Sequence, residues 1–309
     1  MGNYEIMFTL LLIVVVGYVA GKVGYMGGQF DTRLSSIVVN ITCPALILSS
    51  TMNGQLPDRR LILPLLGISL LTYALLSALS WWLSGIVARR PADRGVVAFA
   101  MIFGNVGFIG YPIVASMFGS EAVFYAAVLN VVNTFAVFTV GTALLEPSGE
   151  RPVSRRSRGK SWVQRLYSVP MLAAYMAMLI VALGIDNVPV MVSQTLTMVG
   201  NITVPAALMI VGSAMSQLPP RAMLGNRTVY LTALFRLGLL PLGLFFLFRA
   251  LGFDAYVVNI NTIVIAMPVA TYGTILCLKY GHDTALITEL TLVTTLLSVL
   301  TIPLMAMLF

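Results

Sequence analysis

Long apolar runs without a charged residue dominate the pattern of hydrophobic and polar positions along this chain. Five of these runs each reach about 20 residues, the length at which a helix crosses the hydrocarbon core of a bilayer. They therefore predict several membrane-spanning helices. The five runs are 61–88, 95–120, 122–145, 166–185 and 255–278.

Further apolar runs between them raise the expected number of spans to ten. Ten helices of about 22 residues leave no room for a sizeable soluble domain. The first run lacks a basic leading segment, so it is expected to be a retained helix and not a cleaved signal. The predicted fold class is an all-α integral membrane protein. The expected spans are 5–25, 33–52, 61–88, 95–117, 121–145, 166–184, 189–215, 228–250, 255–278 and 284–308.

Composition excludes a soluble globule, because 59% of the residues are hydrophobic and only 9% are charged, against about a quarter charged in soluble domains. The net charge of +7 does not indicate a nucleic-acid partner, because the basic residues fall between the apolar runs. They indicate orientation instead. An extracytoplasmic N-terminus puts fourteen of the eighteen Lys and Arg residues on the cytoplasmic side, as the positive-inside rule requires.

This orientation predicts a multi-pass protein of the inner (plasma) membrane with both termini extracytoplasmic. The connection 146–165 holds six basic residues together with Pro, Ser and Gly, a composition that is poorly suited to a packed core. It is expected to be a cytoplasmic linker. An additional lipid-binding role of this basic stretch stays open.

The chain repeats itself, since the stretch 40–46 (NITCPAL) returns as 201–207 (NITVPAA) at an offset of 161. The repeat predicts two units, 1–145 and 166–309, joined by the linker 146–165. Each unit has five expected spans, an odd number, so the second unit enters the membrane from the opposite side. Inverted repeats of this kind are typical of transporters with alternating access. The alternative is a duplication that merely built a large helical bundle.

Two spans contain residues that interrupt a helix. Residues 104–112 (GNVGFIGYP) in span 4 hold three glycines and a proline, and span 9 has Met267-Pro268 followed by Thr271 and Tyr272. Discontinuous helices at corresponding positions of two halves indicate a binding site near the membrane midplane. Their free N-terminal N–H groups favour an anion such as a carboxylate. Packing kinks without a ligand are the alternative, because Gly and Pro are common in membrane helices.

Polar residues near these breaks complete the expected site. Asn130 and Asn133 share one face of span 5, and Arg236, buried in span 8, needs a partner such as a substrate carboxylate or Glu289. Glu289 is also the candidate for proton coupling. Interhelical hydrogen bonding is the alternative role of each Asn. The predicted substrate-binding residues are Asn105, Gly107, Pro112, Asn130, Asn133, Pro268, Thr271, Tyr272 and Arg236, and no metal or other cofactor is expected.

The motif 104–112, together with 40–46 and the proline-centred span 9, resembles the auxin efflux carrier family over essentially the whole chain. The short linker is similar to that of bacterial members, which are associated with malate, malonate and similar carboxylates. The resemblance implies a scaffold of spans 1, 2, 6 and 7 and a mobile transport domain of spans 3–5 and 8–10. It also implies crossing of broken spans 4 and 9, an elevator-like motion, a homodimer and an architecture shared with bile-acid/sodium symporters.

The predicted function is secondary transport of small organic anions by alternating access, and carboxylates are the substrate class that the half-helices favour. An anion channel or a membrane sensor on the same fold is the alternative. A membrane enzyme ranks third, because the chain has no HExxH, GxSxG or GxxxxGK[ST] motif and its only histidine, His282, falls in a loop. The expected partners are the substrate anion, membrane lipid and a second copy of the chain.

Overall fold

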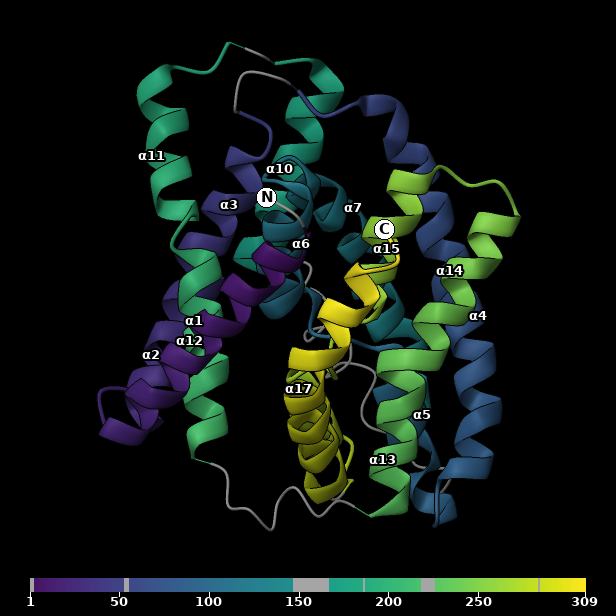
Figure 1. The fold of residues 1–309 in the computed structure, drawn as a ribbon. Helices are drawn as coiled ribbons and strands as arrows, with labels where there is room; N and C mark the ends of the chain where they lie inside the picture. The colour runs from purple at the N-terminus through teal and green to yellow at the C-terminus, as the bar shows by residue number, and fades with distance from the viewer. Residues whose placement is uncertain (1–2, 53–55, 147–166, 186, 218–225, 283) are drawn as a thin grey trace.

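The computed structural model describes residues 3–52, 56–146, 167–185, 187–217, 226–282 and 284–309. Their regular elements are helices, and these residues contain no strand (Figure 1). Six helices are long and apolar enough to cross a bilayer, which confirms an all-α integral membrane protein. They are Gly28–Ser49, Arg59–Val87, Ala122–Leu144, Val190–Ser216, Arg227–Ala250 and Thr284–Ala306.

Four shorter apolar helices, Phe8–Val23, Val106–Phe118, Val169–Leu183 and Ala255–Ile265, overlap the other four expected spans. The number of ten crossings and the inverted relation of the two halves stay predictions. Apart from Glu146, the linker predicted at 146–165 lies outside the described residues.

Several of the helices contain one wider, π-helical turn. Three such turns end two residues before a proline, at Pro44, Pro112 and Pro241. Proline has no N–H to donate and its ring crowds the preceding turn, so the backbone widens there. The elements are α1 (Asn3–Val23), α2 (Gly28–Ile37), η1 (Val38–Thr42), α3 (Cys43–Ser49), α4 (Ile62–Val87), α5 (Arg94–Ile102), η4 (Val106–Gly110), α6 (Tyr111–Phe118), α7 (Ala122–Ala136), η5 (Val137–Gly141), α8 (Thr142–Leu144), α10 (Val169–Leu183), α11 (Val190–Gly200), α12 (Thr203–Ser216), α13 (Arg227–Leu234), η7 (Phe235–Leu239), α14 (Leu240–Ala250), α15 (Ala255–Ile265), α16 (Tyr272–Lys279) and α17 (Thr284–Ala306), with short 3-10 turns at Arg59–Leu61 and Pro91–Asp93.

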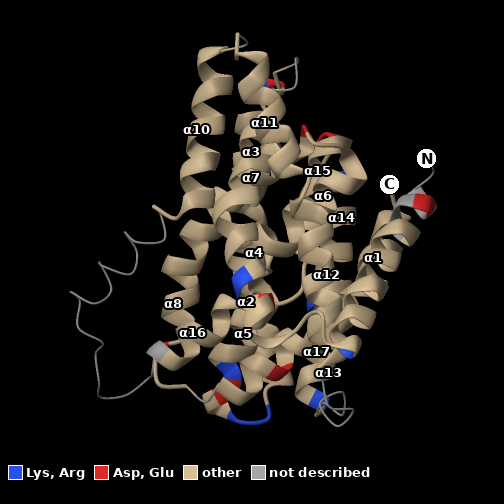
Figure 2. Cartoon of the chain, turned by 90° about the vertical axis from the view of Figure 1, so that its left-hand side faces the viewer, with Lys and Arg blue, Asp and Glu red and all other residues tan. Residues whose placement is uncertain are grey.

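The helices form two packed groups (Figure 1). The first helix group contains α1, α2, α3, α10, α11 and α12. The second helix group contains α4 to α7 and α13 to α17. Figure 2 shows most Lys and Arg segments toward the end of the molecule where α13 begins, away from the two chain ends. This distribution agrees with the predicted orientation, in which the basic end is cytoplasmic.

Glycines let α1 and α12 approach until their backbones touch. A Cβ atom on Gly212 would meet the carbonyl oxygen of Val14 and the backbone nitrogen of Tyr18. A Cβ atom on Gly17 would meet the backbone of Met209. Small residues that bring two backbones close are a common basis of helix association in membranes.

Replacing Gly212 with valine is therefore expected to destabilise the protein by at least about 1–3 kcal/mol, because neither backbone can yield without separating the helices. Thermal unfolding in detergent measures the effect as a lowered Tm. Gly243→Val is the matched control, since Gly243 lies in α14 with nothing within 4 Å of its Cβ position. Equal Tm values of the two variants would contradict the close contact.

Candidate functional site

The broken parts of spans 4 and 9 meet as two short extended segments. α5 ends at Ile102 and α15 at Ile265, and beyond them Gly104 and Val269 form an antiparallel bridge. The N–H of Asn105 donates to the carbonyl of Pro268 (2.8 Å), and that of Ala270 donates to the carbonyl of Phe103 (3.1 Å). The two breaks thus satisfy each other's backbone groups, which is what allows irregular backbone at membrane depth. This contact is called the crossing below.

Arg236 lies against the crossing and is only 2% exposed. Its Nε donates to the carbonyl of Met267 (2.9 Å), and its Nη1 donates to the carbonyls of Met101 (3.1 Å) and Ile102 (2.9 Å). Met101 and Ile102 belong to the last turn of α5 and Met267 lies two residues beyond the end of α15, so the carbonyls are close to two helix ends where the dipole is negative. The guanidinium thus has backbone partners, which the sequence did not suggest. The predicted pairing with Glu289 or with a substrate carboxylate stays a prediction.

A cavity of about 290 Å³ lies beside the crossing and between the two helix groups. Six of the nine predicted substrate-binding residues line it together: Asn105, Gly107, Asn130, Asn133, Thr271 and Tyr272. Their role as substrate contacts stays a prediction, but the fold brings them to one wall from three separate spans. We call this space the crossing cavity.

The other three predicted residues lie behind this wall. Pro112 is buried at the start of α6, Pro268 accepts the hydrogen bond of Asn105 at the crossing, and Arg236 holds the carbonyls described above. Glu289 is half-buried in α17, and it is not among the residues that line the crossing cavity. None of these four residues is among those that line the crossing cavity, and their predicted roles stay predictions.

The wall also contains polar and aromatic residues that the sequence reasoning missed. A usable signal existed for five of them: Thr134 follows Asn130 by one helical turn, Cys43 belongs to the repeated motif, and Gly104, Val106 and Phe108 belong to the motif 104–112. No comparable signal marked the other six. The additional lining residues are Val39, Cys43, Val106, Phe108, Thr134, Val137, Phe138, Ser168, Pro170 and Met171, together with Gly104.

The electrostatics of the crossing cavity favour negative charge. Asn105 stands at the N-terminus of η4 and Thr271 at that of α16, and both line the cavity. Helix N-termini carry a positive partial charge and direct free N–H groups outward. None of the residues that line the cavity is Asp, Glu, Lys or Arg, so the half-helices are the nearest sources of charge on its wall.

Two Asn side chains on the wall each have one amide atom without a hydrogen-bond partner in the described part of the protein. Asn133 donates to Asn130 Oδ1 (2.9 Å), and Asn130 donates to Tyr111 Oη (2.8 Å). Asn105 Nδ2 and Asn133 Oδ1 are buried, and within the described chain neither has a protein partner. Since buried polar groups are normally paired, a bound molecule or water is expected to form the missing hydrogen bonds with these two atoms.

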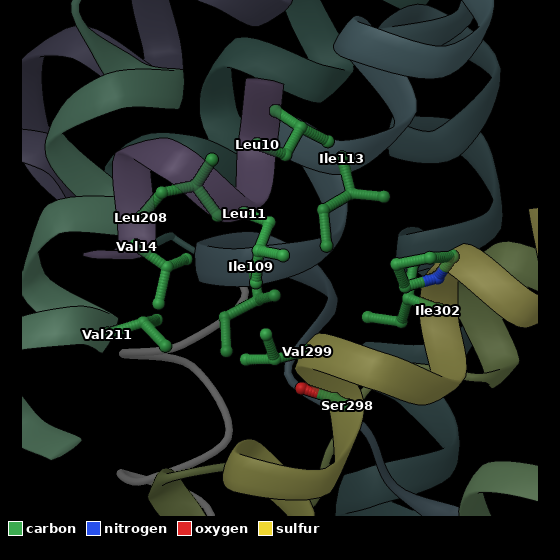
Figure 3. A pocket seen from close by; sticks show the side chains of 11 residues that line it. Leu10, Leu11, Val14, Ile109, Ile113, Leu208, Val211, Ser298, Val299 and Ile302 are labelled. Atoms are coloured by element: carbon green, nitrogen blue, oxygen red, sulfur yellow. The ribbon is translucent and has the colours of Figure 1, made fainter. Parts of the chain in front are cut away.

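A second hollow, of about 40 Å³, contrasts with the crossing cavity (Figure 3). Its wall is formed by α1 and α12 of the first helix group and by η4, α6 and α17 of the second. Ser298 supplies its one hydroxyl group, and the other lining residues are apolar: Leu10, Leu11, Val14, Ile109, Ile113, Leu208, Val211, Val299, Ile302 and Pro303. This hollow marks a stretch where the boundary between the helix groups is held by non-directional contacts.

Discontinuous helices that cross beside a cavity with polar side chains are typical of membrane transport proteins. Comparison with known proteins agrees: the chain matches a family described as "Membrane transport protein" over residues 3–306. The chain therefore belongs to this family, the auxin efflux carrier family, which confirms the family that the motifs indicated.

Three relatives of the chain are transporters by name. One, an uncharacterized transporter of Methanothermobacter thermautotrophicus, is 26% identical over 98% of this chain and 97% of its own length. Another uncharacterized transporter, from Methanocaldococcus jannaschii, is 24% identical over 97% and 96% of the two chains. A protein of Rhizobium meliloti named "Putative malonate transporter" is 23% identical over 94% and 90%.

Proposed function

We propose that this protein is a secondary carrier for small organic anions and that its substrates are carboxylates of the size of malonate. The observation that carries this proposal is the crossing cavity, where two half-helix N-termini and the unpartnered amide N–H group of Asn105 lie on a wall without fixed negative charge. A carboxylate accepts hydrogen bonds from N–H groups and is stabilised by positive dipole ends. The name of the Rhizobium meliloti relative supports the same substrate class.

The proposed mechanism is elevator-type alternating access between inverted repeats. The first helix group corresponds to spans 1, 2, 6 and 7, the proposed scaffold, and the second corresponds to spans 3–5 and 8–10, the proposed transport domain. Residues of both groups line the crossing cavity. Apolar contacts, such as those around the hollow in Figure 3, favour sliding because few hydrogen bonds must break. The proposal also includes a homodimer, in which two copies of the chain associate through their scaffold helices.

In the proposed orientation this conformation faces the cytoplasm. Val137 and Phe138 lie in the second half of span 5, which leads into the predicted cytoplasmic linker, and Ser168 and Pro170 lie at the start of span 6, which follows it. These residues line the crossing cavity. A membrane potential that is negative inside contributes about 2.3 kcal/mol per charge per 100 mV toward anion exit. Efflux therefore needs no coupled ion, whereas uptake needs a proton, with Glu289 as the proposed carrier.

Counterflow in proteoliposomes tests the proposal. Vesicles loaded with unlabelled malonate are expected to accumulate labelled malonate transiently, because a carrier exchanges substrate through one alternating site. Uptake should saturate with external malonate, and uncharged malonamide should not compete. Ohmic single-channel currents without counterflow would instead support the channel alternative and contradict the carrier.

A further inference from the structure

The backbone carbonyls at the crossing form a site for a positive charge. Met101 and Ile102, at the C-terminal end of α5, and Met267, two residues beyond the end of α15, direct three carbonyl oxygens toward the guanidinium of Arg236. In transporters built from broken helices, unwound carbonyls and half-helix C-termini are the groups that coordinate a coupled cation. Here these three carbonyls accept hydrogen bonds from the guanidinium of Arg236, at 2.9 to 3.1 Å.

We propose that Arg236 is a built-in counter-cation that takes the place of a coupled metal cation, so that substrate binding requires no sodium. This inference rests on the proposed carboxylate transport. An Arg side chain is charged at every physiological pH and offers five donors in a fixed planar arrangement. It therefore holds both half-helices permanently, whereas a bound ion would hold them only while it is present.

The position of Arg236 also gives its charge a direct effect on the crossing cavity. A Cβ atom on Gly104 would meet Arg236 Nη2, and Gly104 itself lines the crossing cavity. Only a glycine backbone thus separates the guanidinium from the space proposed for the substrate. Because this region is buried, the charge is weakly screened and attracts an anion more strongly than a surface arginine would. Arg236 is accordingly a positioning residue whose charge, and not only its hydrogen bonding, supports binding.

A pair of substitutions separates charge from hydrogen bonding. Arg236→Lys keeps the positive charge and Arg236→Gln keeps an amide donor without charge. The Kd of malonate, measured in detergent by calorimetry, is expected to stay within about threefold of wild type for the lysine variant and to rise at least about tenfold for the glutamine variant. Arg249→Gln is the control, because Arg249 is exposed at the far end of the same span.

The sodium dependence of malonate binding provides an independent test. Wild-type malonate binding should be equal in sodium chloride and choline chloride, whereas Arg236→Ala, which frees the three carbonyls, should bind malonate several-fold more tightly in sodium. The proposal is overturned if the glutamine variant binds as tightly as the lysine variant, or if wild-type binding requires sodium. The wild-type comparison decides even if Arg236→Gln does not fold, because a sodium requirement overturns the proposal and sodium independence upholds it.

A readout without substrate keeps this inference separate from the proposed function. Sodium, compared with choline at equal concentration, should raise the Tm of Arg236→Ala by about 3 °C and leave the wild-type Tm unchanged. If no carboxylate binds the wild-type protein, the proposed function fails and the Tm comparison still tests the cation site. An equal change of Tm with sodium in the two proteins would overturn the proposal that Arg236 takes the place of a coupled cation.

Discussion

Replacing Gly104 with valine is expected to lower malonate transport below about 1% of the wild-type rate per folded protein. Its new Cβ would meet Arg236 Nη2 and approach the carbonyl oxygen of Met267. Neither neighbour can move freely, because Arg236 Nε donates to that same carbonyl. The two extended segments must therefore separate, and the N-termini of η4 and α16 lose their common orientation toward the cavity.

The measurement is counterflow in proteoliposomes, normalised to the amount of protein that elutes as a single peak from size exclusion. Gly67→Val is the matched control, since Gly67 lies within α4 with nothing within 4 Å of its Cβ position. The control should transport at nearly the wild-type rate. Normal transport by Gly104→Val would mean that the crossing does not determine activity.

The second large effect is expected at the amides of the crossing cavity. Asn105→Ala and Asn133→Ala each remove one buried polar group that has no protein partner. If Asn105 Nδ2 donates to the carboxylate and Asn133 Oδ1 accepts from a water that bridges to it, each loss should raise the Kd of malonate by about 10- to 100-fold. Because no hydrogen bond of Asn105 Nδ2 within the protein is lost, the Tm of Asn105→Ala should change little.

Calorimetric titration of the detergent-solubilised protein with malonate measures this effect. Asn201→Ala is the control, because Asn201 is exposed between α11 and α12 and belongs to the first helix group away from the cavity wall. Wild-type affinity in both cavity variants would reduce Asn105 and Asn133 to packing residues. A lowered Tm of Asn133→Ala alone would reflect its hydrogen bond to Asn130.

The sequence by itself determined the class of this protein and the region of its site. Apolar runs that are long enough to span a bilayer indicate a membrane-embedded helical fold, since lipid cannot hydrogen-bond to exposed backbone N–H and C=O groups. The glycines and proline of 104–112 and the Met267-Pro268 pair are incompatible with regular helix, so both breaks were predictable. The Asn130 and Asn133 face followed from helical periodicity alone.

Only the tertiary structure decided how the two breaks meet and what each polar side chain binds. The sequence indicates that both spans are interrupted, but the pairing of Gly104 with Val269 depends on where each helix ends in space. Arg236 could be recognised as a charge in need of a partner. Its partners are backbone carbonyls, one more than 30 residues and two more than 130 residues away along the chain. Every residue carries such a carbonyl, so sequence identity cannot mark which ones converge on a buried charge.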